Sequence, residues 1–378
     1  MGKFRKEIKY PAASSGVFDP ARNKAVMNQQ PIPKGKEDFK MRKGFLGIIL
    51  CVFLLGIVFP FGNSASGQTI ELKMSHFMPT KHVQDRMVMR PWAEKIEKLT
   101  NGKAKVTIFP GGALGKPPHQ YDNAMKGITD IAFGLQSYTP GRFPLTSSLR
   151  LPFMVKSARQ GSEVLWHVYE KYLKREYKDV KVLWMFMHGP GQLFTTKKQV
   201  KALEDLKGLK IRSPGPIMSK VLRQVGAVPV NMPITQVYTA LERRTVDGVV
   251  VPWEVMRPFR FYERCKYATV ADIYSMTFFV VMNKAKFNSL PADVKEVIEK
   301  NSGMSMSIVA GSEYDSADKP GKEIFIKNGG IIYQLPSSER ERWKNAVIPV
   351  KENWLKEMKA KGLPGEEVLN YAIKMLKE

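Results

Sequence analysis

Leu206-Lys-Gly-Leu-Lys-Ile-Arg-Ser-Pro-Gly-Pro216 predicts the end of one helix, a strand and the start of the next helix. Gly208 suits a helix C-terminus, because glycine tolerates the positive φ found there. The residues from Leu209 to Ser213 then alternate in polarity with the two-residue period of a strand. Arg212 therefore stands where a strand ends beside a helix N-terminus. A guanidinium in that position can bind both oxygens of a carboxylate, and the helix adds partial positive charge.

The alternative for Arg212 is a surface arginine that caps a turn, and the neighbouring sequence favours the binding role. Four blocks carry a family resemblance: Lys207-Gly-Leu-Lys-Ile-Arg212, Gln224-Val-Gly-Ala-Val-Pro-Val230, Gln236-Val-Tyr-Thr-Ala-Leu241 and Thr245-Val-Asp-Gly248. In this order and spacing they resemble the solute receptors of tripartite ATP-independent periplasmic (TRAP) transporters, the DctP-like family. The resemblance extends from about Glu71 to the C-terminus, roughly 300 residues.

The resemblance implies an α/β protein with the two-lobed periplasmic-binding-protein fold. The ligand cleft is expected between the lobes, with a long helix spanning both. We assign residues 68–189 to lobe I, completed by about 278–317, and residues 190–277 to lobe II, completed by about 318–378. Alternating strands and helices along the chain independently indicate largely parallel sheets, whose strand ends carry ligands.

The first 67 residues differ in character from the rest of the chain. Residues 1–43 predict a disordered extension, which is untranslated if Met41 is the true start. Residues 44–67 contain a continuous apolar run from Gly44 to Phe61, preceded by Arg42 and Lys43 and followed by small residues. This pattern is typical of a secretory signal peptide, and an uncleaved membrane anchor stays open because the run approaches the length of a bilayer span. We therefore expect a periplasmic protein.

Charge and cysteine content narrow the function classes. The chain of 378 residues has a formal net charge of +25, of which residues 1–43 contribute +7. The remaining basic residues are interspersed with acidic ones and form no nucleic-acid module, so no nucleic-acid partner is expected. Of the two cysteines, Cys51 lies in the predicted signal, which leaves Cys265 without an intramolecular disulfide partner.

Further candidate ligand-binding residues follow predicted strands. Trp253 and Glu254 come after the apolar run 249–251, Tyr138 lies in a long loop after residues 130–133, and Phe77 lies in the loop after the first strand. Thr277 belongs to the strand by which such receptors return to lobe I. The family resemblance adds Gln192, which stands about twenty positions before the key arginine. His188, in the bend expected to cross between lobes, favours a structural role.

The chemistry expected of this site is capture and not catalysis. The five histidines show no metal-ligand spacing, and no nucleophile motif surrounds Cys265. No cofactor is expected. A cation bound with the ligand at Glu254 stays open, since one carboxylate cannot establish a metal site.

By resemblance, the ligand is a small organic acid and the partners are TRAP membrane permease subunits. The alternatives are a receptor that feeds a signalling partner and, less favoured, an enzyme acting on a small carboxylate. The sequence decides neither the ligand nor whether the protein is a monomer or a dimer.

Overall fold

The computed structural model describes residues 68–377. The predicted N-terminal extension, signal peptide and possible anchor lie outside this range, and so do both candidate start positions. Among the described residues, no helix combines the length and the apolar character needed to cross a membrane.

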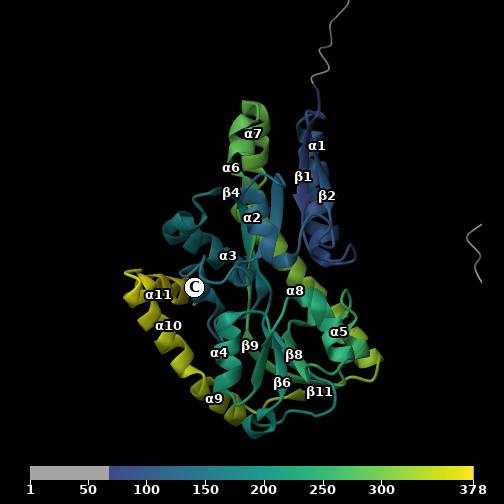
Figure 1. Cartoon of the computed structure of the whole chain (residues 1–378), viewed down its shortest axis with the longest axis vertical. Helices are drawn as coiled ribbons and strands as arrows, with labels where there is room; N and C mark the ends of the chain where they lie inside the picture. Colours follow the sequence, from purple (N-terminus) through teal and green to yellow (C-terminus); the bar gives the residue numbers. More distant parts are fainter. Residues whose placement is uncertain (1–67, 378) are drawn as a thin grey trace, which may run out of the picture. The chain divides into compact units, whose positions relative to one another are not determined.

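Two β-sheets form the framework of the described chain (Figure 1). Their strands are β1 (Ile70–Ser75), β2 (Ala104–Phe109), β3 (Ile131–Leu135), β4 (Val180–Met187), β5 (Gly191–Thr195), β6 (Lys210–Ser213), β7 (Val228–Asn231), β8 (Gly248–Val251), β9 (Tyr267–Tyr274), β10 (Thr277–Asn283) and β11 (Ile331–Gln334). The first sheet has the order β2-β1-β3-β10-β4 and defines lobe I. The second has the order β11-β9-β5-β8-β6-β7 and defines lobe II.

Both sheets are mixed and not purely parallel. In lobe I, β1 runs parallel to β2 and β3, whereas β10 runs antiparallel to β3 and β4. In lobe II, β6 is parallel to β7 and β8, whereas β5 is antiparallel to β8 and β9. The antiparallel strands β5 and β10 are the ones that arrive directly from the other lobe. The crossing between lobes therefore sets their direction.

The α-helices pack around these sheets and bury apolar faces against them. They are α1 (Arg90–Leu99), α2 (Gln120–Met125), α3 (Ala158–Val168), α4 (Pro216–Gln224), α5 (Val237–Glu242), α6 (Lys284–Ser289), α7 (Ala292–Lys300), α8 (Met304–Lys327), α9 (Ser337–Ala346), α10 (Ile348–Ala360) and α11 (Gly365–Met375). As predicted, α4 begins at Pro216, where the missing N–H of proline costs no helix hydrogen bond.

Two short strand connections join the lobes side by side. Residues 188–190 lead from β4 to β5, and residues 275–276 lead from β9 to β10. The His188 backbone N–H donates to the Met276 carbonyl at 3.3 Å, and the Ser275 hydroxyl donates to the His188 carbonyl. These hydrogen bonds tie the two connections into one hinge.

Helix α8 lies across both lobes (Figure 1). The predicted long helix is interrupted at Asn301–Gly303, so α7 and α8 are separate, but α8 continues through Gly311 and Pro320. Gly311 lies against the Ala158 carbonyl of α3 in lobe I, and Gly321 lies against the Trp253 carbonyl in lobe II. A side chain at either glycine would separate α8 from its neighbour.

The last helix returns to lobe I. Figure 1 shows α9, α10 and α11 running from the second sheet back toward α3. Tyr172 donates to Glu367 of α11 at 2.8 Å, and Gln160 of α3 donates to the Leu376 carbonyl at 2.9 Å. The expected assignment of residues 318–378 to lobe II therefore does not hold for α11. Its apolar face, with Val368 and Leu369 buried, packs on the lobe I helices.

Candidate ligand-binding site

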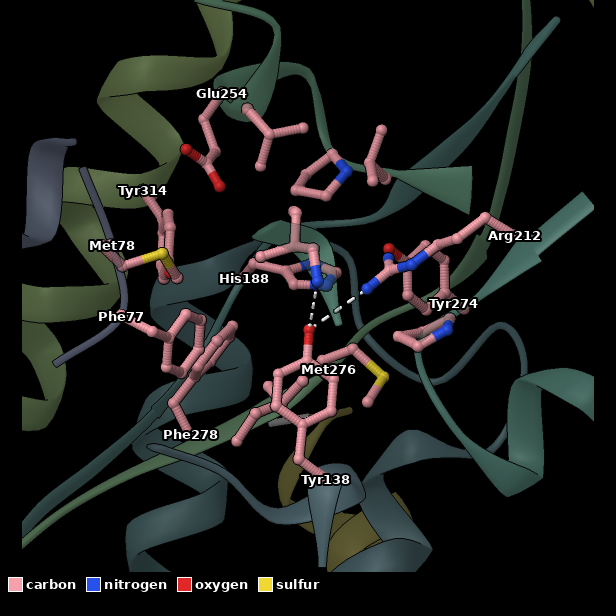
Figure 2. Close-up of a pocket in the computed structure, with 16 residues that line it drawn as sticks. Phe77, Met78, Tyr138, His188, Arg212, Glu254, Tyr274, Met276, Phe278 and Tyr314 are labelled. Carbon is pink, nitrogen blue, oxygen red and sulfur yellow. Dashed lines mark hydrogen bonds between the residues drawn. The ribbon is translucent and has the colours of Figure 1, made fainter. Parts of the chain in front are cut away.

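A cavity between the lobes collects side chains from both sheets, both crossing connections and α8. Figure 2 shows its walls. The lining residues are Phe77, Met78, Leu135, Tyr138, His188, Arg212, Pro214, Ile234, Val251, Pro252, Glu254, Val255, Tyr274, Met276, Phe278 and Tyr314. Most are apolar, and a few polar groups converge on the interior, which is the usual composition of a small-molecule site.

Arg212 is the cationic group of the cavity. It lies in β6, between β7 and β8, and only 2 % of it is exposed. Its Nε donates to the Met232 carbonyl at 3.1 Å, and its Nη2 donates to the Tyr138 hydroxyl at 3.1 Å. No carboxylate of the described chain pairs with this guanidinium. A buried positive charge without a counter-ion is costly, so the site is suited to an anionic ligand.

Tyr138 joins the two lobes at the arginine. Its segment follows β3 in lobe I, whereas its hydroxyl oxygen accepts from Arg212 and from the Ile234 backbone N–H at 2.9 Å, both in lobe II (Figure 2). Because that oxygen accepts two hydrogen bonds, its own hydrogen is free to donate. A ligand carboxylate beside Arg212 can receive it.

Aromatic rings make up much of the remaining wall. The Phe77 and Tyr138 ring centroids lie 5.7 Å apart, and those of Phe278 and Tyr314 lie 5.6 Å apart. Such tilted pairs are favourable aromatic contacts. They give the cavity flat apolar surfaces on which a ring or an aliphatic body can pack.

His188, at the hinge, also faces the cavity. Burial, with a further contribution from the positive charge of Arg212, lowers the pKa of His188 to about 4, so the imidazole is neutral at pH 7. Its Nδ1 lies 2.6 Å from the Gly189 carbonyl oxygen. A carbonyl only accepts, so Nδ1 carries the proton and Nε2 is left as an acceptor. His188 therefore combines the structural role predicted for it with a position on the cavity wall.

Glu254 marks a second polar region. It belongs to a short 3-10 helix, η9 (Trp253–Met256), and its carboxylate oxygen Oε2 lies 3.2 Å from Nε2 of His82. The two atoms are in contact without forming a hydrogen bond, and neither has another hydrogen-bond partner in the described chain. Behind them, burial and then the negative charge of Glu254 raise the pKa of Asp318 to about 7. Nowhere in residues 68–377 do three or more His, Cys, Asp or Glu side chains form a group able to hold a metal.

The structure brings four of the seven predicted site residues to this cavity: Phe77, Tyr138, Arg212 and Glu254. Gln192, Trp253 and Thr277 lie elsewhere.

Gln192 is used within the sheet of lobe II. Its side-chain oxygen accepts from the Ala271 and Asp272 backbone N–H groups at 2.9 and 3.1 Å, and its amide nitrogen donates to the Asp272 carboxylate at 2.7 Å. The pairing of β5 with β9 shifts register here, and Asp272 takes a φ of 49°. Gln192 thus satisfies backbone groups that the irregular ladder leaves unpaired.

Trp253 and Thr277 are core residues. The Trp253 ring meets Phe194 edge-on at 4.9 Å between centroids and Phe325 at 5.7 Å. Thr277, the first residue of β10, is fully buried. A position after a strand end indicates the ligand side of a sheet, but it does not say which way the side chain turns.

Two wall residues, Tyr314 and Tyr274, and the buried His82 behind Glu254 gave no clear signal in the sequence. Tyr314 lies in the middle of a 24-residue helix. Tyr274 ends β9, and its hydroxyl donates to the Val250 carbonyl at 2.8 Å. His82 follows the loop that contains Phe77, at the ligand end of β1, which is the one feature that could have marked it.

Two lobes joined by a hinge, with a cavity between them that contains a buried guanidinium without a carboxylate partner in the described chain, have the architecture of a solute-binding protein. The sequence profile of the bacterial extracellular solute-binding proteins, family 7 (DctP), matches residues 74–357, and the chain belongs to this family. The predicted fold and family are therefore confirmed.

Solved structures of TRAP receptors are similar throughout the described region. A TRAP solute-binding protein from a marine metagenome, specific for aromatic acid ligands and in complex with metahydroxyphenylacetate, is 34% identical, with a TM-score of 0.79. A TRAP solute-binding protein from Rhodoferax ferrireducens, in complex with copurified benzoate, is 32% identical, with a TM-score of 0.80. Each alignment covers 82% of this chain and 98% of the other.

One relative of known name is itself called DctP, the name of the matching family. The C4-dicarboxylate-binding periplasmic protein DctP of Rhodobacter capsulatus is 25% identical over 290 residues, which cover 76% of this chain and 86% of that protein. The chain is thus a TRAP-type solute-binding protein, and its family is one of extracellular receptors and not of enzymes.

Proposed function

We propose that this receptor captures a small monocarboxylate with an aromatic or apolar body, holds its carboxylate on Arg212, and delivers it to a TRAP membrane permease. The observation that carries the proposal is the buried Arg212 guanidinium without a carboxylate partner in the described chain. Within the protein, Arg212 donates hydrogen bonds from Nε to the Met232 carbonyl and from Nη2 to the Tyr138 hydroxyl. Its remaining N–H groups are available to a ligand.

Closure of the lobes would complete the binding site. The carboxylate would receive hydrogen bonds from Arg212 in lobe II and from Tyr138 in lobe I, so both sets of contacts exist only when the lobes are together. A ligand stabilises the closed form by the contacts that it makes only there. Phe77, Phe278 and Tyr314 would then pack on the body of the acid.

The test is calorimetric titration of benzoate into the wild-type protein, the Arg212→Ala variant and the Arg212→Lys variant. Loss of one partner of a buried charged pair costs about 2–5 kcal/mol, which is a loss of affinity of about 30-fold or more. Arg212→Lys should also lose affinity, because an ammonium group cannot form the paired hydrogen bonds of a guanidinium.

Arg223→Ala is the matched control, because Arg223 is exposed on α4. It should bind benzoate as the wild-type protein does. Equal benzoate affinity in the Arg212 and Arg223 variants would refute a carboxylate site at Arg212.

We propose that export precedes this function, through the apolar segment within residues 44–67. The assay is mass spectrometry of the N-terminus of protein recovered from the periplasm. A mature N-terminus near residue 67 supports a cleaved signal, and an intact N-terminus in the membrane fraction supports the anchor.

A further inference from the structure

A group of three buried polar atoms lies in and behind the cavity wall remote from the arginine. These atoms are Glu254 Oε2, His82 Nε2 and the Tyr314 hydroxyl, and all three lack hydrogen-bond partners within the described chain. Glu254 is 4 % exposed, Tyr314 is 1 % exposed and His82 is completely buried. Figure 2 shows Glu254 and Tyr314 on one side of the cavity and Arg212 on the other.

The three side chains are neighbours. His82 Nε2 is 3.2 Å from Glu254 Oε2, and the His82 ring meets the Tyr314 ring edge-on at 5.7 Å between centroids. Glu254 and Tyr314 both line the cavity. Buried polar atoms are nearly always satisfied in folded proteins, so three such atoms together at a cavity indicate a place where water or a polar group of the ligand is the partner.

The protonation of His82 follows from its other hydrogen bond. Its Nδ1 accepts from the Gln84 backbone N–H at 3.1 Å, so Nδ1 carries no proton. The imidazole is then the neutral tautomer with its hydrogen on Nε2. The site therefore presents a donor at His82 beside an acceptor at Glu254, too poorly aligned to satisfy each other.

A group that both donates and accepts satisfies this pair, and a hydroxyl is the smallest such group of an organic acid. A second carboxylate only accepts, and it would place a negative charge beside Glu254. An ammonium only donates, which leaves the His82 hydrogen unpaired. An unsubstituted ring leaves every orphan unpaired, which costs affinity because the atoms lose water without gaining a partner.

We propose that Glu254 and His82, with Tyr314 beside them, form a hydroxyl-recognising subsite, and that the receptor prefers aryl monocarboxylates with a ring hydroxyl remote from the carboxylate. The ligand hydroxyl donates to Glu254 and accepts from His82 Nε2. This subsite rests on the proposed function, because the carboxylate on Arg212 sets which end of the ligand reaches Glu254.

The experiment compares benzoate, 3-hydroxybenzoate, 4-hydroxybenzoate and terephthalate by calorimetry on protein expressed from the full chain. One of the two hydroxybenzoates should bind at least about tenfold more tightly than benzoate, and terephthalate should bind more weakly than benzoate. The readout is the Kd of benzoate divided by the Kd of the tighter-binding hydroxybenzoate. A change that weakens both ligands equally leaves this ratio unchanged.

Two variants test the residues separately. Glu254→Gln keeps the shape but loses the charge, and His82→Phe removes the donor; each should reduce the ratio to less than about threefold. Glu296→Gln is the control, because Glu296 is an exposed residue of α7, and it should keep the wild-type ratio. Circular dichroism and thermal melting without ligand confirm that each variant is folded.

The outcomes separate this inference from the proposed function. Benzoate binding that depends on Arg212, without a hydroxyl preference, overturns the subsite alone. A preference that survives in both Glu254→Gln and His82→Phe also overturns it. Failure of every aryl acid to bind overturns the subsite and the aryl acid class together.

Discussion

The substitution Gly321→Ala tests how α8 is held against lobe II. A Cβ at position 321 would lie 2.0 Å from the Trp253 carbonyl oxygen and 2.6 Å from its carbon. Alanine favours a helix over glycine by about 1 kcal/mol, so helix propensity alone predicts a more stable protein. The atoms in the way are backbone, however, and overpacking of this kind costs up to about 3 kcal/mol. We expect a net loss of about 2 kcal/mol in the free energy of unfolding.

Urea unfolding, followed by circular dichroism and tryptophan fluorescence, measures this loss. Ser316→Ala is the control, because Ser316 is an exposed residue of the same helix, and its free energy of unfolding should change by about 0.5 kcal/mol or less. A Gly321→Ala protein as stable as the wild type, or more stable, would refute the close approach of α8 to η9.

Two further predictions concern residues at the hinge. The pKa of His188 is lowered from 6.5 to about 4, so between these pH values the unfolded chain binds a proton that the folded protein does not. The free energy of unfolding therefore decreases as the pH is lowered through this range. Between pH 7 and 4.5 the wild-type free energy of unfolding should fall by about 2–3 kcal/mol more than that of His188→Gln, measured by urea titration. The raised pKa of Asp318 acts in the opposite direction in both proteins, so it cancels in this difference; equal pH slopes would contradict the buried neutral imidazole. Gln192→Ala should lower the free energy of unfolding by about 1–3 kcal/mol, because it leaves buried backbone groups unpaired. Its benzoate affinity should change by less than about tenfold, and a larger loss would restore Gln192 as a ligand contact.

The sequence and the structure agree best where local patterns set the outcome. The strand predicted from Leu209 to Ser213 is observed as Lys210–Ser213, and α4 begins at the predicted Pro216. Both follow from side-chain alternation and from proline chemistry, which act over a few residues. The position of Arg212 at a strand end beside a helix is of the same kind.

The sequence could not show which way a side chain turns. Trp253 and Glu254 are adjacent on η9, yet Trp253 enters the core against Phe194 and Glu254 faces the cavity. Gln192 stands at the place that the family resemblance marks for a ligand contact. Its side chain instead accepts a hydrogen bond from the Ala271 backbone N–H, where the pairing of β5 with β9 is irregular. These outcomes depend on contacts between segments that are far apart in the chain.

From the sequence alone, the two-lobed α/β fold, the receptor family and Arg212 as the candidate carboxylate-binding residue followed, because each depends on short-range pattern or on blocks in a characteristic order. Only the tertiary structure decided that Arg212 is buried without a carboxylate partner in the described chain. It alone placed His82 from lobe I and Tyr314 from α8 beside Glu254 from lobe II. The physical reason is that a binding site between lobes is made of long-range contacts, and no local period in a sequence encodes which distant side chains meet.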